Sequence, residues 1–214
     1  MRGLYAIVDT DFLTARGVPV QAFAERLLEA RPAAIQLRAK GAGARDTLDL
    51  AHLLAARCEV LGIPFFVNDR PDLALLAGAA CGVHLGQTDL RLEDVRRLAP
   101  ELPAGISTHR PEEVERALGD KPAYLAFGPV FATRSKANAE PVVGLAALAN
   151  TAERCRRAGV PVVAIGGIDE ERASAVAAVA GAGAVIAALL PPGGLSEVTT
   201  RARRLHRALG GSEP

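Results

Sequence analysis

Short runs of apolar residues recur along the chain, and a longer stretch with a helical spacing of apolar positions follows each of them. The runs are apolar throughout, which is typical of strands buried on both faces of a parallel sheet. They predict strands at residues 4–8, 33–37, 64–67, 82–85, 104–107, 124–127, 162–165 and 184–188. The intervening periodicity predicts helices at about residues 20–31, 44–60, 72–78, 91–98, 111–118, 144–158, 169–179 and 195–208.

Strict alternation of strands and helices is compatible with an open doubly wound sheet or with a closed barrel. Eight such units in 214 residues favour closure. We therefore expect an α/β protein with a single-domain (β/α)8 TIM barrel over residues 1–209 and a short polar tail at 210–214.

The composition excludes several classes of partner. Lys and Arg number 25 against 24 Asp and Glu, so no global field attracts nucleic acid or an anionic membrane. The first residues lack the pattern of a signal peptide, and no apolar stretch has the length of a membrane span, so we expect a cytoplasmic protein. A homo-oligomer is compatible with the sequence. The three cysteines, Cys58, Cys81 and Cys155, lack the spacing of metal ligands and are expected to be small buried hydrophobes.

Polar residues follow the second predicted strand at every other position. In a parallel barrel the carboxyl ends of the strands converge on one mouth, where the active site is built. Gln36, Arg38 and Lys40 alternate with apolar residues, so an extended segment would direct all three to the same side. An exposed pair of cations is the alternative for Arg38 and Lys40, but their position directly after a buried strand favours ligand binding.

Carboxylate and amide side chains follow the next two strands. Asn68 and Asp69 come directly after the third strand, and Asp89 lies in the loop after the fourth. Two carboxylates from adjacent strand ends are hard oxygen ligands, which suit Mg²⁺. For either aspartate alone, N-capping of the following helix is an equally good explanation.

The fifth strand ends in Ser107, Thr108 and His109, directly before a helix that begins at Pro111. We expect Thr108 to cap that helix, whereas the hydroxyl of Ser107 is close enough to the strand to face the mouth. His109 is interpreted as a solvated loop residue.

Two further segments have the composition of phosphate sites. The long polar loop 128–145 carries Thr133, Ser135 and Lys136, which supply hydroxyl donors and an ammonium group within four residues. Gly166 and Gly167 follow the seventh strand, where backbone N–H groups can approach a phosphate before the next helix.

Taken together, six ordered segments resemble the thiamine phosphate synthase family, which is a family of (β/α)8 barrels. They are QLRAK (36–40), VNDRPDLA (67–74), GVHLGQTD (82–89), GISTH (105–109), GPVFATRSK (128–136) and AIGGI (164–168). The family joins hydroxymethylpyrimidine diphosphate to a thiazole phosphate and releases pyrophosphate, so the resemblance implies small phosphorylated substrates and Mg²⁺.

The resemblance also implies a role for each matching residue. The pyrimidine diphosphate would be held by Gln36, Arg38, Lys40, Asn68, Ser107 and Lys136, of which Arg38, Lys40, Ser107 and Lys136 would assist catalysis. Asp69 and Asp89 would bind Mg²⁺, and the thiazole phosphate would be held by Thr133, Arg134, Ser135 and Gly167.

The chain departs from the family pattern at two positions. Ser135 stands where the family usually has Thr, which keeps the hydroxyl. The segment GAGAVIAALL (181–190) lacks the family's Ser after the eighth strand, so backbone N–H groups near Ala187 and Ala188 would have to bind the phosphate.

Two other functions compete with coupling. A related thiazole tautomerase has the same barrel but typically lacks the Asn-Asp pair and the second Asp, and has His where this chain has Pro129. The second is a barrel without catalytic activity that senses thiamine intermediates, which a fold alone never excludes.

Overall fold

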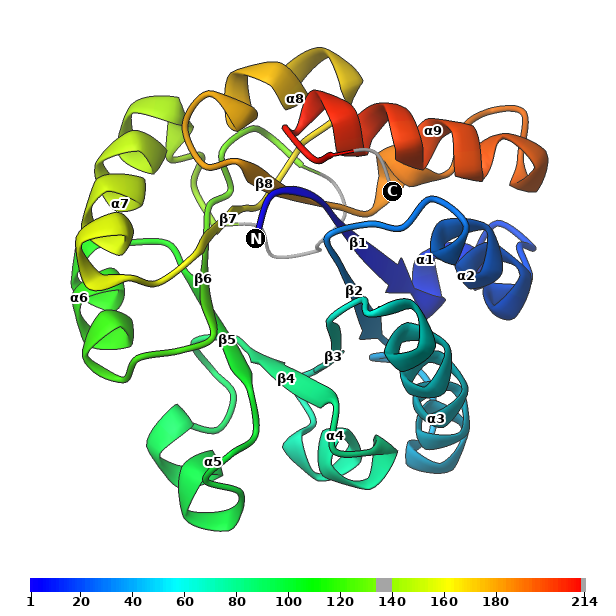
Figure 1. The fold of residues 1–214 in the computed structure, drawn as a ribbon, viewed down its shortest axis with the longest axis horizontal. Coiled ribbons are helices and arrows are strands. Elements are labelled where there is room, and N and C mark those ends of the chain that lie inside the picture. The colour runs from blue at the N-terminus through cyan, green and yellow to red at the C-terminus, as the bar shows by residue number, and fades with distance from the viewer. Residues whose placement is uncertain (134–139, 213–214) are drawn as a thin grey trace.

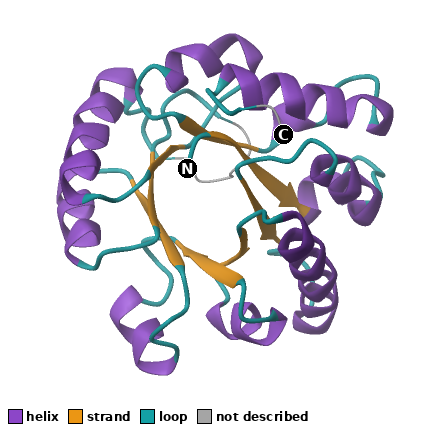
Figure 2. Ribbon diagram, in the orientation of Figure 1, coloured by secondary structure: helices purple, strands orange, loops and turns teal. Residues whose placement is uncertain are grey.

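The computed structural model describes residues 1–133 and 140–212, and within them the strands close into a parallel barrel surrounded by helices (Figures 1 and 2). Each strand pairs with the next along the chain, and β8 pairs with β1. This confirms the predicted closed (β/α)8 barrel. The strands are β1 (Gly3–Asp9), β2 (Ala34–Arg38), β3 (Phe65–Asn68), β4 (Cys81–Leu85), β5 (Ala104–Thr108), β6 (Tyr124–Phe127), β7 (Val162–Ala164) and β8 (Ala182–Val185).

The helices form the outer ring. They are α1 (Thr10–Thr14), α2 (Val20–Leu28), α3 (Ala44–Leu61), α4 (Pro71–Ala77), α5 (Leu92–Leu98), α6 (Pro111–Gly119), α7 (Gly144–Ala158), α8 (Glu170–Ala177) and α9 (Leu195–Ala208), with a 3₁₀ turn η1 at Ala187–Leu189. Pro111 occupies the first turn of α6, as predicted, because proline needs no N–H partner there. The sequence pattern missed α1, which at five residues is too short to show a helical period.

The strands are buried on both faces and so separate two apolar cores. The larger core lies between the barrel and the helices, and it includes Leu4, Val8 and Leu37. The smaller core fills the barrel interior and consists of Tyr5, Ala34, Phe66, Tyr124, Ala126, Val163, Ala182 and Ala184, with Ile7 and Ile165 packed against them. Because alternate residues of a strand face opposite sides, Gln36, Asn68, His84 and Ser107 continue the interior rows toward the carboxyl ends.

The eighth strand differs from the prediction. It covers Ala182–Val185, and the expected strand residues Ala187 and Ala188 form the 3₁₀ turn η1. Ile186 leaves the extended conformation, with φ of −115° and ψ of −80°, which ends the strand. Small apolar residues suit both conformations, so composition could not place this boundary.

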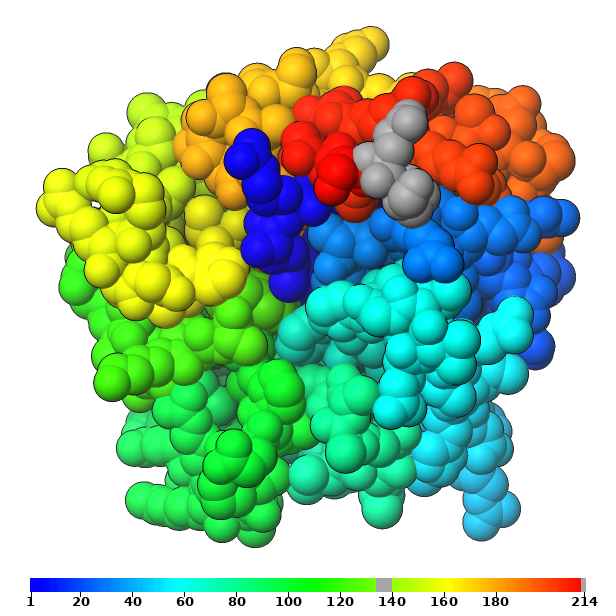
Figure 3. Space-filling view, viewed as in Figure 1, coloured from blue at the N-terminus to red at the C-terminus, as the bar shows by residue number. Residues whose placement is uncertain are grey.

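The first residues of the chain and the last turn of α9 lie side by side (Figure 3). The backbone N–H of Leu4 donates to Nδ1 of the buried His206 in α9, over 3.3 Å, and Gly3 and Gly211 pack against the same imidazole ring. Within the described residues, no helix is long and apolar enough to cross a membrane.

Candidate functional site

The two predicted metal-binding aspartates lie together at the carboxyl ends of β3 and β4. Asp89 lies close enough to Asp69 for that carboxylate to raise the pKa of Asp89, and Nζ of Lys40 lies 3.0 Å from Oδ2 of Asp69. Oδ2 of Asp89 also accepts a hydrogen bond of 2.6 Å from the backbone N–H of Gly86. The three charged side chains come from three successive strand ends, so the predicted convergence is confirmed for Lys40, Asp69 and Asp89.

Helix capping does not explain either aspartate. The residues at the N-cap positions of α4 and α5 are Arg70 and Arg91, and neither helix start has a side-chain cap. Asp69 has a positive φ of 63°, in the left-handed region, which turns the chain sharply after the strand. Burial and the nearby Asp69 raise the pKa of Asp89, which is the effect expected when two carboxylates share a poorly solvated site.

This pair of carboxylates fits a divalent cation. Burial and like charge disfavour two bare carboxylates in contact, and a cation between them would remove both penalties. Within the described residues, no cluster of three or more His, Cys, Asp or Glu side chains is present. Mg²⁺ needs no such cluster, since it is commonly held by one or two carboxylates, waters and substrate phosphates.

Arg38 lies at the same mouth but pairs with a residue that the sequence analysis missed. Its guanidinium donates to Oδ2 of Asp9, the last residue of the adjacent strand β1. Asp9 is 3% exposed and Arg38 13%, so Arg38 is no surface cation. Asp9 also caps α1, because its Oδ1 accepts a hydrogen bond of 3.0 Å from the N–H of Phe12. The strand-end rule that found Asp69 would also have found Asp9.

A second missed residue holds the loop that carries Lys40. Both carboxylate oxygens of Asp11 in α1 lie 3.2 Å from the backbone nitrogen of Gly41, which donates to them. The start of α1 therefore supports the mouth through two carboxylates, that of its N-cap Asp9 for Arg38 and that of Asp11 for the residue after Lys40.

Three other predicted diphosphate ligands, Gln36, Asn68 and Ser107, lie on the interior rows of the barrel just below the mouth. Gln36 and Ser107 are buried, and they are connected through hydrogen bonds that involve Tyr5, Tyr124 and His84, which the sequence analysis did not select. Tyr5 and Tyr124 are the only tyrosines of the chain. A tyrosine in a buried strand needs a partner for its hydroxyl, and that rule could have indicated the network.

The predicted roles of Thr108 and His109 are wrong. Thr108 is fully buried on the outer side of β5, where its hydroxyl donates to the carbonyl of Ala126 over 3.0 Å. Arg110 occupies the N-cap position of α6 without a side-chain cap. His109 is not simply solvated, since its Nδ1 donates to the carbonyl of Gly128, in the loop after β6.

The loops after β6 and β7 pack closely against each other. Val130 and Phe131 donate backbone hydrogen bonds to the carbonyls of Ile165 and Gly166, over 2.8 and 3.1 Å. Gly167 has φ of +66°, and a Cβ atom there would lie 2.4 Å from the carbonyl oxygen of Ala132, the neighbour of Thr133. The structure thus brings the predicted phosphate residues Gly166, Gly167 and Thr133 to one region.

Three of the predicted ligands, Arg134, Ser135 and Lys136, lie outside the described residues. Ala187 and Ala188 follow β8 and so remain at the carboxyl end of the barrel, within η1. The cysteines are buried as expected, and burial raises the pKa of Cys58 and Cys81 to about 12 and that of Cys155 to about 11. Such thiols are poor nucleophiles at neutral pH.

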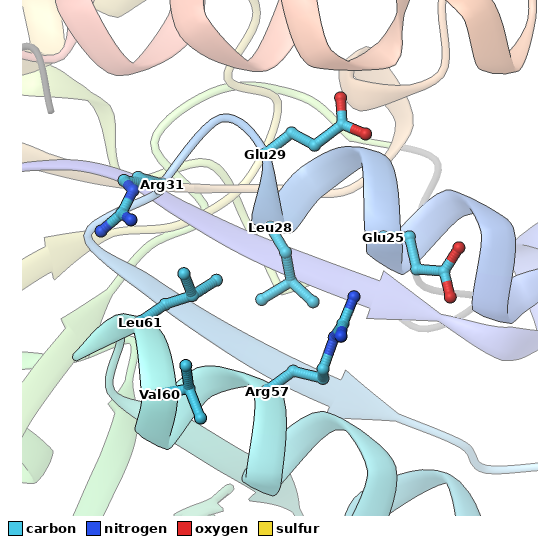
Figure 4. Close-up of a pocket in the computed structure, with 7 residues that line it drawn as sticks. All are labelled: Glu25, Leu28, Glu29, Arg31, Arg57, Val60 and Leu61. Atoms are coloured by element: carbon cyan, nitrogen blue, oxygen red, sulfur yellow. The ribbon is translucent and has the colours of Figure 1, made fainter.

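A surface pocket of about 450 Å³ lies between α2 and α3 and is distinct from the mouth (Figure 4). Its lining includes Leu28, Glu29 and Leu61 from the last turns of these helices or directly after them. Helices of a (β/α)8 barrel run antiparallel to the strands, so this pocket faces the amino-terminal end of the barrel. Its lining carries two glutamates and two arginines, so the charges balance and give no preference for a diphosphate.

The fold and the mouth define a single-domain (β/α)8 barrel with paired carboxylates beside Lys and Arg side chains. Residues 4–189 match the family model described as thiamine monophosphate synthase, and the chain belongs to that family.

Similar proteins agree with this assignment. The chain is 41% identical to a thiamine-phosphate synthase of Methanocella arvoryzae over 204 residues, which are 94% of this chain and 92% of the relative. It is 47% identical to a thiamine-phosphate synthase of Thermus thermophilus over 145 residues, or 68% of each chain. A solved thiamine phosphate pyrophosphorylase from Pyrococcus furiosus superposes with a TM-score of 0.82 at 31% identity, covering 97% of this chain and 95% of the other.

Proposed function

We propose that this protein is a transferase that couples hydroxymethylpyrimidine diphosphate to thiazole phosphate, giving thiamine phosphate and pyrophosphate. The observation that carries the proposal is the contact of Asp69, Asp89 and Lys40 at one rim of the barrel. A departing diphosphate develops negative charge, and this rim offers a cation site and an ammonium group to stabilise it. Family membership supports the same reaction.

Asp69 and Asp89 would hold Mg²⁺, which supplies charge neutralisation on the leaving diphosphate. Lys40, Arg38 and Ser107 would donate to diphosphate oxygens, and Gln36 and Asn68 would position the same substrate. The electron-rich aminopyrimidine stabilises the cation left behind, and the thiazole nitrogen attacks with its own lone pair. The reaction therefore needs no strong general base from the protein.

The thiazole phosphate would lie on the opposite side of the mouth. Gly166, Gly167 and Thr133 are brought together there, and Ala187 and Ala188 of η1 follow the adjacent strand. Backbone N–H groups would replace the serine hydroxyl that the family has after β8. Arg134, Ser135 and Lys136 are proposed to complete the two phosphate sites. A cytoplasmic location and a homo-oligomer stay predictions.

The decisive experiment incubates the purified protein with both substrates and measures pyrophosphate and thiamine phosphate. We expect both products in equal amounts with Mg²⁺ and none with excess chelator. Asp69→Asn and Asp89→Asn should each lower kcat/KM by about a hundredfold or more, because they remove ligands of a metal worth several kcal/mol. Asp94→Asn is the matched control, since Asp94 is an exposed residue of α5 that pairs with Arg97.

Other outcomes would favour the competing functions. Isomerisation of the thiazole carboxylate phosphate without coupling would support the tautomerase, and binding of both substrates without turnover would support the sensor. The relatives described above are synthases, so they lend no support to either alternative.

A further inference from the structure

A continuous row of hydrogen bonds crosses the barrel interior from β2 to β5. Nε2 of Gln36 lies 3.1 Å from the hydroxyl of Tyr5, which lies 2.6 Å from the hydroxyl of Tyr124. The Tyr124 hydroxyl lies 2.6 Å from Nδ1 of His84, and Nε2 of His84 lies 2.8 Å from Oγ of Ser107. All five side chains are at most 8% exposed. We call this row the interior relay.

The number of protons in the interior relay determines which group donates and which accepts in each of its hydrogen bonds. Gln36 donates to Tyr5, and among the described residues the hydrogen-bonding partners of the Tyr5 hydroxyl are Gln36 and Tyr124. The proton of Tyr5 must therefore go to Tyr124, because a buried hydroxyl proton without an acceptor is costly. Burial raises the pKa of both tyrosines, so both carry their protons at neutral pH.

The direction of donation from Tyr5 to Tyr124 also determines the tautomer of His84. Tyr124 accepts from Tyr5 and so donates its own proton to Nδ1 of His84. A neutral imidazole that accepts at Nδ1 carries its proton at Nε2, and this proton is donated to Oγ of Ser107. Ser107 is thereby an acceptor toward His84, and its own proton is directed to another acceptor.

We propose that Tyr5, Tyr124 and His84 are positioning residues that make Ser107 a hydrogen-bond donor to an anionic oxygen of the diphosphate substrate. Phosphate oxygens of a diphosphate bound to Mg²⁺ accept hydrogen bonds and donate none, so only this direction of the interior relay suits them. With the opposite direction, Ser107 would donate to His84 and would present a lone pair to the mouth, which would select a substrate N–H instead. The diphosphate as ligand rests on the proposed function, whereas the direction itself rests on the hydrogen bonds alone.

The first test is the ¹⁵N NMR spectrum of the histidine side chains in the intact protein, with His84 assigned through His84→Gln. We expect Nε2 of His84 to carry the proton and Nδ1 to have the shift of an unprotonated acceptor. A proton on Nδ1 would overturn the proposal. This measurement needs no substrate, so it decides the direction of the interior relay even if the coupling reaction is absent.

The second test is a double-mutant cycle of Tyr124→Phe and Ser107→Ala, measured on kcat/KM for the diphosphate substrate. Each single change should lower kcat/KM about tenfold, since a hydrogen bond to a charged group is lost or misdirected. If Tyr124 acts through Ser107, Tyr124→Phe should have less than a twofold effect in the Ser107→Ala background. Independent, multiplicative losses would show a merely structural role for Tyr124 and would overturn the positioning role. In Tyr124→Phe the His84 spectrum should also show a mixture of tautomers.

Discussion

Asp9 and Arg38 occupy paired positions at the ends of adjacent strands, and one carboxylate both caps α1 and holds the guanidinium. The Arg38 side chain is thereby held at the mouth, and within residues 1–133 and 140–212 its hydrogen-bond partner is Asp9. Two strand ends and a five-residue helix are thus coupled at the point where the diphosphate is proposed to bind.

Asp9→Asn should uncouple the guanidinium without removing the helix cap, because the asparagine oxygen can still accept from Phe12. We expect kcat/KM for the diphosphate substrate to fall about tenfold, as one charged hydrogen bond is worth about 1.5–3 kcal/mol. In the Arg38→Ala background the same change should have little further effect. Steady-state kinetics measures kcat/KM in each case. If Asp9→Asn lowers kcat/KM equally in the unmodified protein and in Arg38→Ala, Asp9 does not act through Arg38.

Lys136→Ala should mainly lower turnover. The charge that Lys136 is proposed to meet grows as the diphosphate leaves, so kcat should fall about a hundredfold while substrate affinity changes little. Lys121→Ala, in the turn after α6, is the control for loss of a cation. An unchanged kcat would remove Lys136 from the leaving-group site.

Gly167→Ala should weaken both the fold and the binding of thiazole phosphate. The new Cβ would meet the Ala132 carbonyl at 2.4 Å in addition to the strain of a positive φ, so we expect a loss of about 2 kcal/mol or more in unfolding free energy. Gly17 has nearly the same φ, +64° against +66°, but no atom within 4 Å of an added Cβ. Gly17→Ala should therefore lose only about 1 kcal/mol and keep the affinity. Similar losses of unfolding free energy for both variants, measured by urea unfolding, would show that the loops after β6 and β7 do not need to pack so closely.

The free energy of unfolding should decrease in mild acid through His206. Burial lowers the pKa of His206 below its ordinary value of 6.5, so the unfolded chain takes up the proton at a higher pH than the folded one. The contribution of neutral His206 to the free energy of unfolding is therefore complete above pH 6.5. It is lost as the pH falls from 6.5 through the lower pKa of the folded state. Protonation would also remove the Nδ1 acceptor of Leu4.

Urea unfolding at about pH 8 and about pH 5.5 measures this effect. His206→Gln should reduce the difference in unfolding free energy between the two pH values. His52→Gln, which changes an exposed histidine of α3, should retain it. A difference unaffected by His206→Gln would place the acid sensitivity elsewhere.

The strand-end rule predicted much of the site because it depends only on local pattern. Each buried run is apolar on both faces, so the first polar residue after it lies at the end of a strand, and in a parallel barrel those ends meet. Lys40, Asp69 and Asp89 were found this way although they are distant in sequence. The rule placed the end of the fifth strand one residue early, at 107, so Thr108 was expected to cap the next helix although it is the last residue of β5.

The amino-acid sequence by itself determined the alternation of strands and helices, the buried faces, and the polar residues that follow each strand, since these depend on spacing along the chain. Tertiary structure alone decided the pairing of Asp9 with Arg38 and the interior relay from Gln36 to Ser107. Tyr5 and Tyr124 are 119 positions apart, and their hydroxyls meet only because the barrel closes. Once the interior is sealed, each buried polar group must find its partner there, and closure rather than local pattern selects that partner.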